Sequence, residues 1–185
     1  MGPPKPANIQ IDDWGGYYTV WWRWGGAKQF GLLIFAVLID IAMAGFFVFL
    51  FHGWRDFTSE IVSIHLISAV IAAAVFTYTS LCGAVNRTWV SLESGALIVR
   101  HGPLPWLGKR DLLSQEIESF FSGSYEKKSR HKKLTKFQLL ARLKNGVTMS
   151  LLRGLDSREI PDFLVEILSQ KLKLAPRQTA VAAQN

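Results

Sequence analysis

Two ionisable residues, Asp40 and His65, lie inside long apolar stretches of this sequence, where a charge or an imidazole can do chemistry. Three kinds of chemistry follow from such a pair. Asp40 and His65 can make polar contacts within the protein or to a partner, they can belong to a proton or ion path, or His65 can ligate a haem or chlorophyll-type metal. The polar contact is favoured, because two helices alone do not enclose a path and a single His is a weak metal signal.

The two stretches themselves predict a transmembrane hairpin over residues 30–85. Residues 30–51 contain one charged residue and residues 61–82 contain none apart from His65. As helices, each would be about 33 Å long, enough to cross a bilayer core of about 30 Å. A pair of buried soluble helices is the alternative, but it needs more surrounding protein than this sequence offers.

Small and polar residues recur every four positions in both stretches: Ala36, Asp40 and Ala44 in the first, and His65, Ala69, Ala73 and Thr77 in the second. Stripes of small residues let membrane helices approach closely. In an antiparallel hairpin Asp40 would lie level with Ala72 or Ala73, about 10 Å along the axis from His65. The expected hydrogen-bond partner of Asp40 is therefore Ser68, Thr77 or a group on another protein.

The distribution of charge predicts the orientation. Residues 1–85 carry four Lys and Arg against five acids, and residues 86–185 carry seventeen against nine. The segment between the spans contains Arg55 as its only basic residue. The positive-inside rule then places both termini in the cytoplasm. The single cysteine, Cys82, leaves no disulfide or thiolate metal site within the chain.

An aromatic segment precedes the first span, within residues 1–29. Two Gly pairs, at residues 15–16 and 25–26, interrupt it, and its members are Trp14, Tyr17, Tyr18, Trp21, Trp22, Arg23 and Trp24. One interpretation is a belt at the lipid interface, where indoles are enriched. The other is a surface that docks a protein partner, because Trp, Tyr and Arg dominate binding hot spots.

Residues 86–174 predict a cytoplasmic domain. Alternating apolar residues favour antiparallel strands, with tight turns at Ser94–Gly95 and Asn145–Gly146, and an amphipathic helix follows with Asp156 and Glu159 at its start. The expected fold class is α+β: a two-helix transmembrane hairpin plus a small antiparallel barrel or sandwich with a C-terminal capping helix. Residues 175–185 are expected to form a tail.

A basic loop is predicted between two of these strands, and it contains Lys127, Lys128, Arg130, Lys132, Lys133 and Lys136. Contact with anionic lipid, docking to an acidic partner and a plain solvated loop are three interpretations. No aromatic residues interleave the cations, so nucleic acid is not an expected partner.

The segments "NRT", "LIVRHGPLPW" and "LLRGLD" resemble a group of bacterial membrane proteins. Those proteins carry a two-helix anchor and a cytoplasmic domain similar to bacterial pleckstrin-homology domains. The resemblance covers roughly residues 30–174 and implies an interaction module in the bacterial inner membrane without catalytic residues. The N-terminal Cys-rich zinc ribbon frequent in that family has no counterpart here, because residues 1–29 contain no Cys.

No catalytic motif appears: the sequence has no Gly-rich phosphate loop, HExxH or GxSxG, and no enzyme activity is expected. The first hypothesis is a non-catalytic subunit of a larger membrane complex, respiratory or photosynthetic, that packs against other membrane proteins. It needs no cofactor of its own, and it contacts pigment or haem only within that complex. The alternative is a membrane-tethered regulator whose basic loop contacts anionic lipid.

Overall fold

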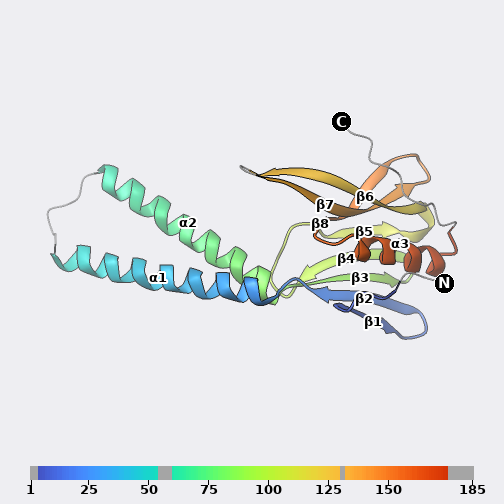
Figure 1. Ribbon diagram of the computed structural model, residues 1–185, viewed down its shortest axis with the longest axis horizontal. Helices are drawn as coiled ribbons and strands as arrows, with labels where there is room; N and C mark the ends of the chain where they lie inside the picture. The colour runs from blue at the N-terminus through green and yellow to red at the C-terminus, as the bar shows by residue number, and fades with distance from the viewer. Residues whose placement is uncertain (1–3, 54–59, 130–131, 175–185) are drawn as a thin grey trace. The chain divides into compact units, whose positions relative to one another are not determined.

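A computed structural model describes residues 4–53, 60–129 and 132–174 of the chain. Figure 1 labels its helices and strands along the chain. They are β1 (Ile9–Asp13), β2 (Tyr17–Arg23), α1 (Ala27–Gly53), α2 (Glu60–Val85), β3 (Arg87–Glu93), β4 (Ala96–Gly102), β5 (Arg110–Leu113), the 3₁₀ turn η1 (Ser114–Glu116), β6 (Ile117–Ser129), β7 (Lys132–Leu143), β8 (Thr148–Leu155) and α3 (Glu159–Lys171).

The chain divides into two compact units, which are described separately. The first, called the β-domain here, contains residues 4–22, 88–101 and 107–174 of the described chain. The second, called the helical unit, contains residues 23–53, 60–87 and 102–106. The predicted α+β class is confirmed at this level.

The strands of the β-domain form two antiparallel sheets and not the closed barrel that was one of the expected forms. A five-stranded sheet has the order β1-β2-β3-β4-β5, and a three-stranded sheet has the order β6-β7-β8. The turn η1 separates the last strand of the first sheet from the first strand of the second. In the part of the chain that the structure describes, no pairing joins the two sheets.

The N-terminal aromatic segment corrects the expected domain boundary at residue 29. It is a β-hairpin in which β1 and β2 pair with a register that joins Ile9 to Trp22 and Asp13 to Tyr18. Side chains alternate across a strand, so Tyr18, Val20 and Trp22 share one face. All three are buried in the core of the β-domain, at 7% exposure or less. The segment therefore belongs to the fold of the β-domain and is not a separate element.

The two long helices are an insertion between neighbouring strands. β2 and β3 are adjacent in the five-stranded sheet, although α1 and α2 lie between them in the chain. Three residues connect β2 to α1, and the single residue Asn86 connects α2 to β3. The helical pair is thus an extended β2–β3 connection.

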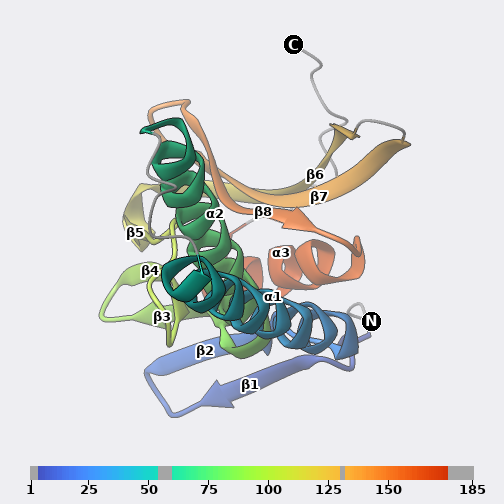
Figure 2. The same cartoon turned by 90° about the vertical axis from the view of Figure 1, so that its left-hand side faces the viewer.

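One apolar core unites the β-domain, and α3 contributes to it through Phe163, Leu164 and Leu168. Figures 1 and 2 show α3 lying alongside the three-stranded sheet, and it packs on β6 and β7. Its C-terminal Lys171 reaches the N-terminal hairpin, with Nζ 2.6 Å from Asp13 Oδ2. The helix therefore connects both sheets.

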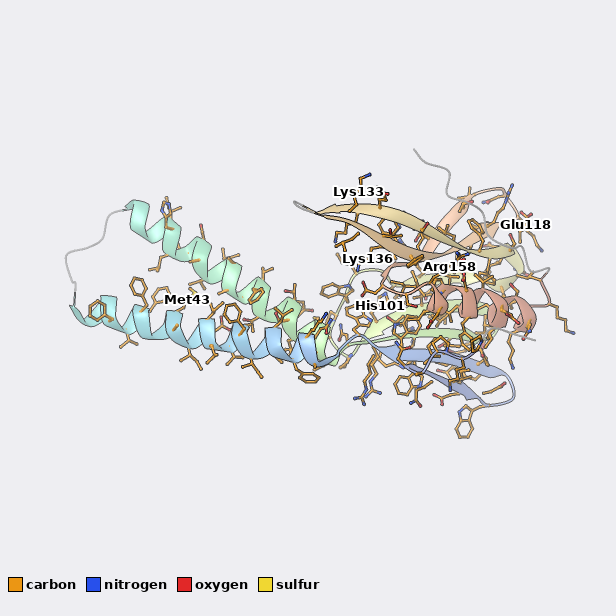
Figure 3. The ribbon with its side chains drawn as sticks, in the orientation of Figure 1. Met43, His101, Glu118, Lys133, Lys136 and Arg158 are labelled. Atoms are coloured by element: carbon orange, nitrogen blue, oxygen red, sulfur yellow. The ribbon has the colours of Figure 1, made fainter. Side chains whose placement is uncertain are left out.

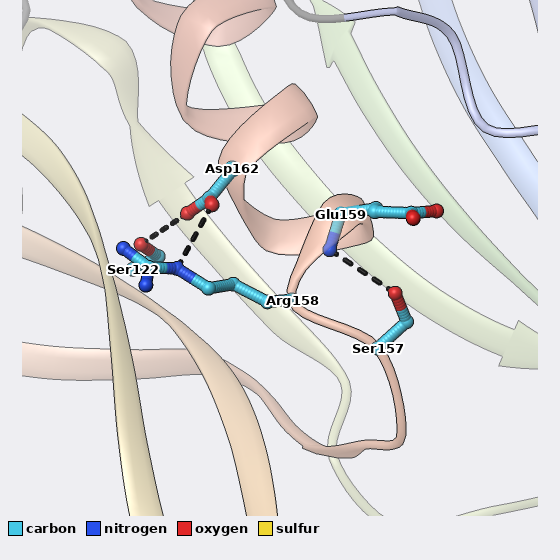
Figure 4. A network of polar contacts seen from close by, with 5 residues as sticks. All are labelled: Ser122, Ser157, Arg158, Glu159 and Asp162. Carbon is cyan, nitrogen blue, oxygen red and sulfur yellow. Dashed lines mark hydrogen bonds and ion pairs between the residues drawn. The ribbon is translucent and has the colours of Figure 1, made fainter.

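The start of α3 differs from the predicted Asp156–Glu159 cap. Ser157 Oγ accepts the N–H of Glu159 at 3.1 Å, while Asp162 accepts from Ser122 Oγ and, at 3.1 Å, from Arg158 Nε (Figure 4). Pro161 lies in the first turn, where its missing N–H would have no helical partner. The helix consequently begins two residues before the proline.

Both predicted turns are present, with one difference of type. Ser94 and Gly95 have φ of 49° and 78°, as the two central residues of a type I′ turn require. At the second turn Gly146 has φ of 84° and its N–H donates to the carbonyl of Leu143. That pattern is the longer hairpin turn with a glycine bulge.

Two helices are long and apolar enough to span a membrane, over Ala27–Phe49 and Ile64–Val85. Their large apolar side chains are exposed along the length of both helices: Ile34, Ile41 and Phe49 of α1 are at least 63% exposed. Exposed apolar surface of this extent marks a membrane or protein contact. α1 and α2 approach each other at the ends joined to the strands and diverge towards the C-terminal end of α1 and the N-terminal end of α2 (Figure 1).

Candidate functional site

A polar pair, Asp40 and Thr77, joins the two apolar helices of the helical unit. Thr77 Oγ1 donates a hydrogen bond to Asp40 Oδ2 at 2.7 Å, and both residues are half-buried. Nearby Ala36 is fully buried, and the Phe35 and Phe76 rings meet edge to face with centroids 6.4 Å apart. The polar contact therefore lies in the half of the hairpin where the helices pack closely.

His65 does not belong to that contact. It lies twelve residues before Thr77 on α2, about 18 Å along the helix axis, and its side chain is exposed. The predicted partner Ser68 donates to the carbonyl of Ile64 in its own helix, at 2.8 Å. Ala44 and Ala69 are exposed, so the predicted stripe of small residues packs only in its strand-proximal half. Among the described residues, no three His, Cys, Asp or Glu side chains are grouped as a metal site.

We expect Thr77→Val to weaken the packing of α1 on α2 by about 0.6–1.7 kcal/mol, the range for interhelical hydrogen bonds in membranes. The matched control is Thr79→Val on the same helix, since Thr79 Oγ1 donates only locally to the carbonyl of Phe76 at 3.0 Å. Unfolding of the chain in lipid nanodiscs would measure both variants. Equal losses for the two variants would show that the Asp40 contact contributes nothing.

A second cluster, at the strand-proximal base of the helical unit, was not predicted. Asn86 is fully buried, and its side chain makes two hydrogen bonds to the backbone of Leu104. Leu104 N–H donates to Asn86 Oδ1 at 2.9 Å, and Asn86 Nδ2 donates to the Leu104 carbonyl at 3.1 Å. The Asn86 carbonyl accepts the N–H of Trp24 at 3.0 Å. One residue thus connects the end of α2, the chain entering α1, and the loop after β4.

The segment Gly102–Trp106, which begins at the last residue of β4, is called the Pro loop here. Tyr78 of α2 donates its hydroxyl to the carbonyl of Pro105 at 2.6 Å. The Trp106 and Trp24 rings meet edge to face, with centroids 5.2 Å apart and planes at 82°. Two features of the sequence mark the residues of this cluster: an Asn directly after an apolar span, and two prolines within three positions. The sequence does not show that these two features are in contact.

Gly25 gives a matched test of this base cluster. A Cβ added at Gly25 would lie 2.6 Å from the backbone oxygen of Ala84, whereas one at Gly26 would meet only the end of the Gln29 side chain at 3.8 Å. We expect Gly25→Ala to destabilise the helical unit by about 1–3 kcal/mol through overpacking, and Gly26→Ala to be tolerated. Thermal unfolding of both variants in detergent micelles would measure this. Tolerance of both would contradict the close approach.

The seven residues predicted for docking or a lipid belt differ in their exposure to solvent. Tyr18 and Trp22 lie in the core of the β-domain, so their assignment to a docking surface is wrong. Trp14 at the β1–β2 turn is 79% exposed, Tyr17 is 40% exposed and Arg23 is exposed. Trp21 is half-buried and donates from Nε1 to Asp12 Oδ2 at 2.9 Å. Half-buried Trp24 belongs to the base cluster.

Tyr18 shows how completely the hairpin joins the β-domain. Burial and the nearby Asp13 carboxylate raise the pKa of Tyr18 to about 12. The Lys171 ammonium lies 4.5 Å from the centroid of the Tyr18 ring, and its hydrogen bond lowers the pKa of Asp13. These three residues form a polar edge to the core.

The basic loop is instead the end of a long two-stranded ribbon. β6 and β7 pair from Ile117 and Leu143 out to Ser129 and Lys132, while β8 pairs only as far as Phe137. Lys127 and Lys128 therefore lie on β6 and Lys132, Lys133 and Lys136 on β7, while Arg130 falls outside the described residues.

Two of the ribbon cations have acidic partners. Lys133 Nζ lies 3.2 Å from Glu126 Oε2, and Lys136 donates to Asp156. Figure 3 shows Lys133 and Lys136 on the ribbon. These ion pairs reduce the positive charge that the ribbon can present to a lipid or to an acidic partner.

The conspicuous histidine of the "RHGPLPW" segment is structural. His101 Nδ1 lies 2.9 Å from Thr88 Oγ1, and burial lowers the pKa of the His101 imidazole. This hydrogen bond joins His101 of β4 to Thr88 of the adjacent strand β3. His101 is not part of any predicted catalytic group.

In comparisons with known proteins, no family model and no curated protein matches the chain.

Proposed function

We propose that this protein is a non-catalytic accessory subunit of a larger membrane assembly. α1 and α2 span the membrane, and the β-domain docks other proteins of the assembly at the cytoplasmic surface. The observation that carries the proposal is the insertion of the helical pair between paired strands, through connections of three residues and one residue. Such connections give the β-domain little reach, so it acts at the membrane surface and not on distant soluble partners.

The docking surface in this proposal is the tip of the N-terminal hairpin. Trp14 and Tyr17 are its exposed aromatic side chains, and the Trp14 N–H closes the turn on the Tyr17 carbonyl at 3.0 Å. A largely exposed indole on an ordered turn is typical of an interface anchor.

The location proposed for the chain is the bacterial inner membrane, with both termini in the cytoplasm. The excess of Lys and Arg after residue 85 supports this orientation. Antiparallel strands followed by one helix support a relationship of the β-domain to bacterial pleckstrin-homology domains. The polar bond between Asp40 and Thr77 supports a structural role for Asp40 within the anchor. We propose no resident cofactor, and His65 contacts pigment or haem only within the host complex.

The test is co-purification from native membranes in a mild detergent, followed by mass spectrometry. A stoichiometric set of membrane proteins is expected with the wild-type chain. Trp14→Ala should leave the chain in the membrane but reduce the amount of co-purified protein. Full occupancy with this variant would refute the hairpin tip as the docking surface, and migration of the wild-type chain alone would refute the subunit proposal.

If the wild-type chain migrates alone, the alternative function applies: a membrane-tethered regulator that contacts anionic lipid through the β6–β7 ribbon. The ion pairs of Lys133 and Lys136 argue against it, because both cations already have acidic partners.

A further inference from the structure

The Pro loop has the chemistry of a segment that lies in a poorly hydrated environment. Pro103 and Pro105 have no backbone N–H, and the N–H and carbonyl of Leu104 are both paired with Asn86. The carbonyl of Pro105 accepts the hydroxyl of Tyr78. Each of these three paired groups has a partner within the protein, which lowers the cost of placing this part of the chain in a poorly hydrated environment.

The side chains of the same loop are apolar and partly uncovered. Trp106 is 41% exposed although its ring packs against Trp24, and Pro103 and Pro105 are exposed. Leu107, the next residue, is 91% exposed. A loop surrounded by water would more commonly expose polar side chains and unpaired backbone groups.

The bonds of the loop place it at the ends of both apolar helices. Asn86 directly follows α2, Trp24 lies three residues before α1, and Tyr78 is in the last turns of α2. Indoles at the ends of membrane spans are enriched at the lipid interface, since they combine an apolar body with one N–H donor.

We propose that the Pro loop, with Trp24 and Trp106, inserts into the bilayer interface, at the boundary between lipid headgroups and acyl chains. The loop is a third membrane-contacting element beside α1 and α2, and lipid covers its exposed apolar side chains. The inference rests on the proposed insertion of α1 and α2 in a membrane, and the experiment below separates the two.

The experiment uses the full chain with Cys82→Ala, since Cys82 is the only cysteine. Single cysteines replace Leu107, Leu38 or Trp14 and carry an environment-sensitive fluorophore in vesicles of phosphatidylcholine and phosphatidylglycerol. Leu38 is 58% exposed on α1 and reports insertion of the helix, while Trp14 is 79% exposed in the β-domain and reports the aqueous phase. Quenching by aqueous iodide and by lipid-attached nitroxides is measured at each position.

We expect the label at 107 to emit at shorter wavelength than the label at 14 and to be quenched several-fold less by iodide, with strong quenching by the lipid nitroxides. Asn86→Ala should raise iodide quenching at 107 by freeing the loop. Iodide quenching at 107 equal to that at 14, with the label at 38 protected, would overturn the inference while membrane insertion stands. Exposure of the label at 38 to iodide would overturn both the insertion of the Pro loop and the proposed insertion of the helices in the membrane.

Discussion

Replacing Trp22 with Ala is expected to lower the free energy of unfolding of the β-domain by about 3–5 kcal/mol. Trp22 is 5% exposed and lies in the core with Val20 and Ile9. Its removal would lose the transfer free energy of an indole and leave a cavity. Denaturant unfolding in detergent micelles, followed by circular dichroism of the strands, would measure the change.

The matched control is Trp14→Ala in the same hairpin. Trp14 is 79% exposed, and a surface substitution away from caps and buried polar groups changes stability by about 0.5 kcal/mol or less. The two variants therefore separate the structural role of the hairpin from its docking role. Trp22→Ala should destabilise the β-domain, whereas Trp14→Ala should only release partners. Similar small losses for both would place Trp22 outside the core.

Asn86→Ala is expected to open the Pro loop at a cost of about 2–4 kcal/mol, because the N–H and carbonyl of Leu104 both lose their partners. Asn86 is fully buried, so no water replaces the lost amide without rearrangement. Hydrogen exchange of peptides that cover residues 102–107, measured in lipid nanodiscs, should show a large loss of protection in the variant.

The control for that substitution is Asn145→Ala, at an exposed turn of the β-domain. Asn145 Oδ1 accepts only the N–H of Val147, at 3.0 Å. Exchange in the Pro loop should be unchanged in this variant. Unchanged protection of Leu104 in Asn86→Ala would show that the side chain of Asn86 does not hold the loop.

The two predictions bear on different parts of the proposed function. Trp22 keeps the N-terminal hairpin in the β-domain, and in the proposed function the exposed Trp14 and Tyr17 of this hairpin contact a partner. Asn86 connects the Pro loop to the ends of the two helices that we propose to span the membrane. The first residue therefore supports docking and the second supports anchoring.

The sequence by itself determined the helices, the turns and the class of fold, because these depend on local patterns. Two apolar runs of 22 residues predict helices whatever lies around them, and α1 and α2 cover both runs. Ser94–Gly95 and Asn145–Gly146 predicted two hairpins, since positive φ favours glycine at such positions. The apolar face of α3 was likewise visible at helical spacing.

Tertiary structure alone decided the role of the aromatic segment. A run of Trp and Tyr has the composition of a lipid belt, a docking surface or a buried strand. Only pairing with β1 and β3 assigns Tyr18 and Trp22 to the core and leaves Trp14 exposed. β1 and β2 are separated from β3 by the whole helical pair, and no local pattern specifies which distant strand will be the neighbour.

The same limit applied to the polar contacts of the helical unit. Helical spacing correctly made Thr77 one of the candidate partners of Asp40. The axial position of one helix relative to the other, however, depends on side-chain packing along both helices. Asn86 and Leu104 are eighteen positions apart, with two strands between them in the chain. Their hydrogen bonds form only because the Pro loop folds back onto the end of α2. The sequence thus determined the helices and the turns, and long-range packing decided which of their residues meet.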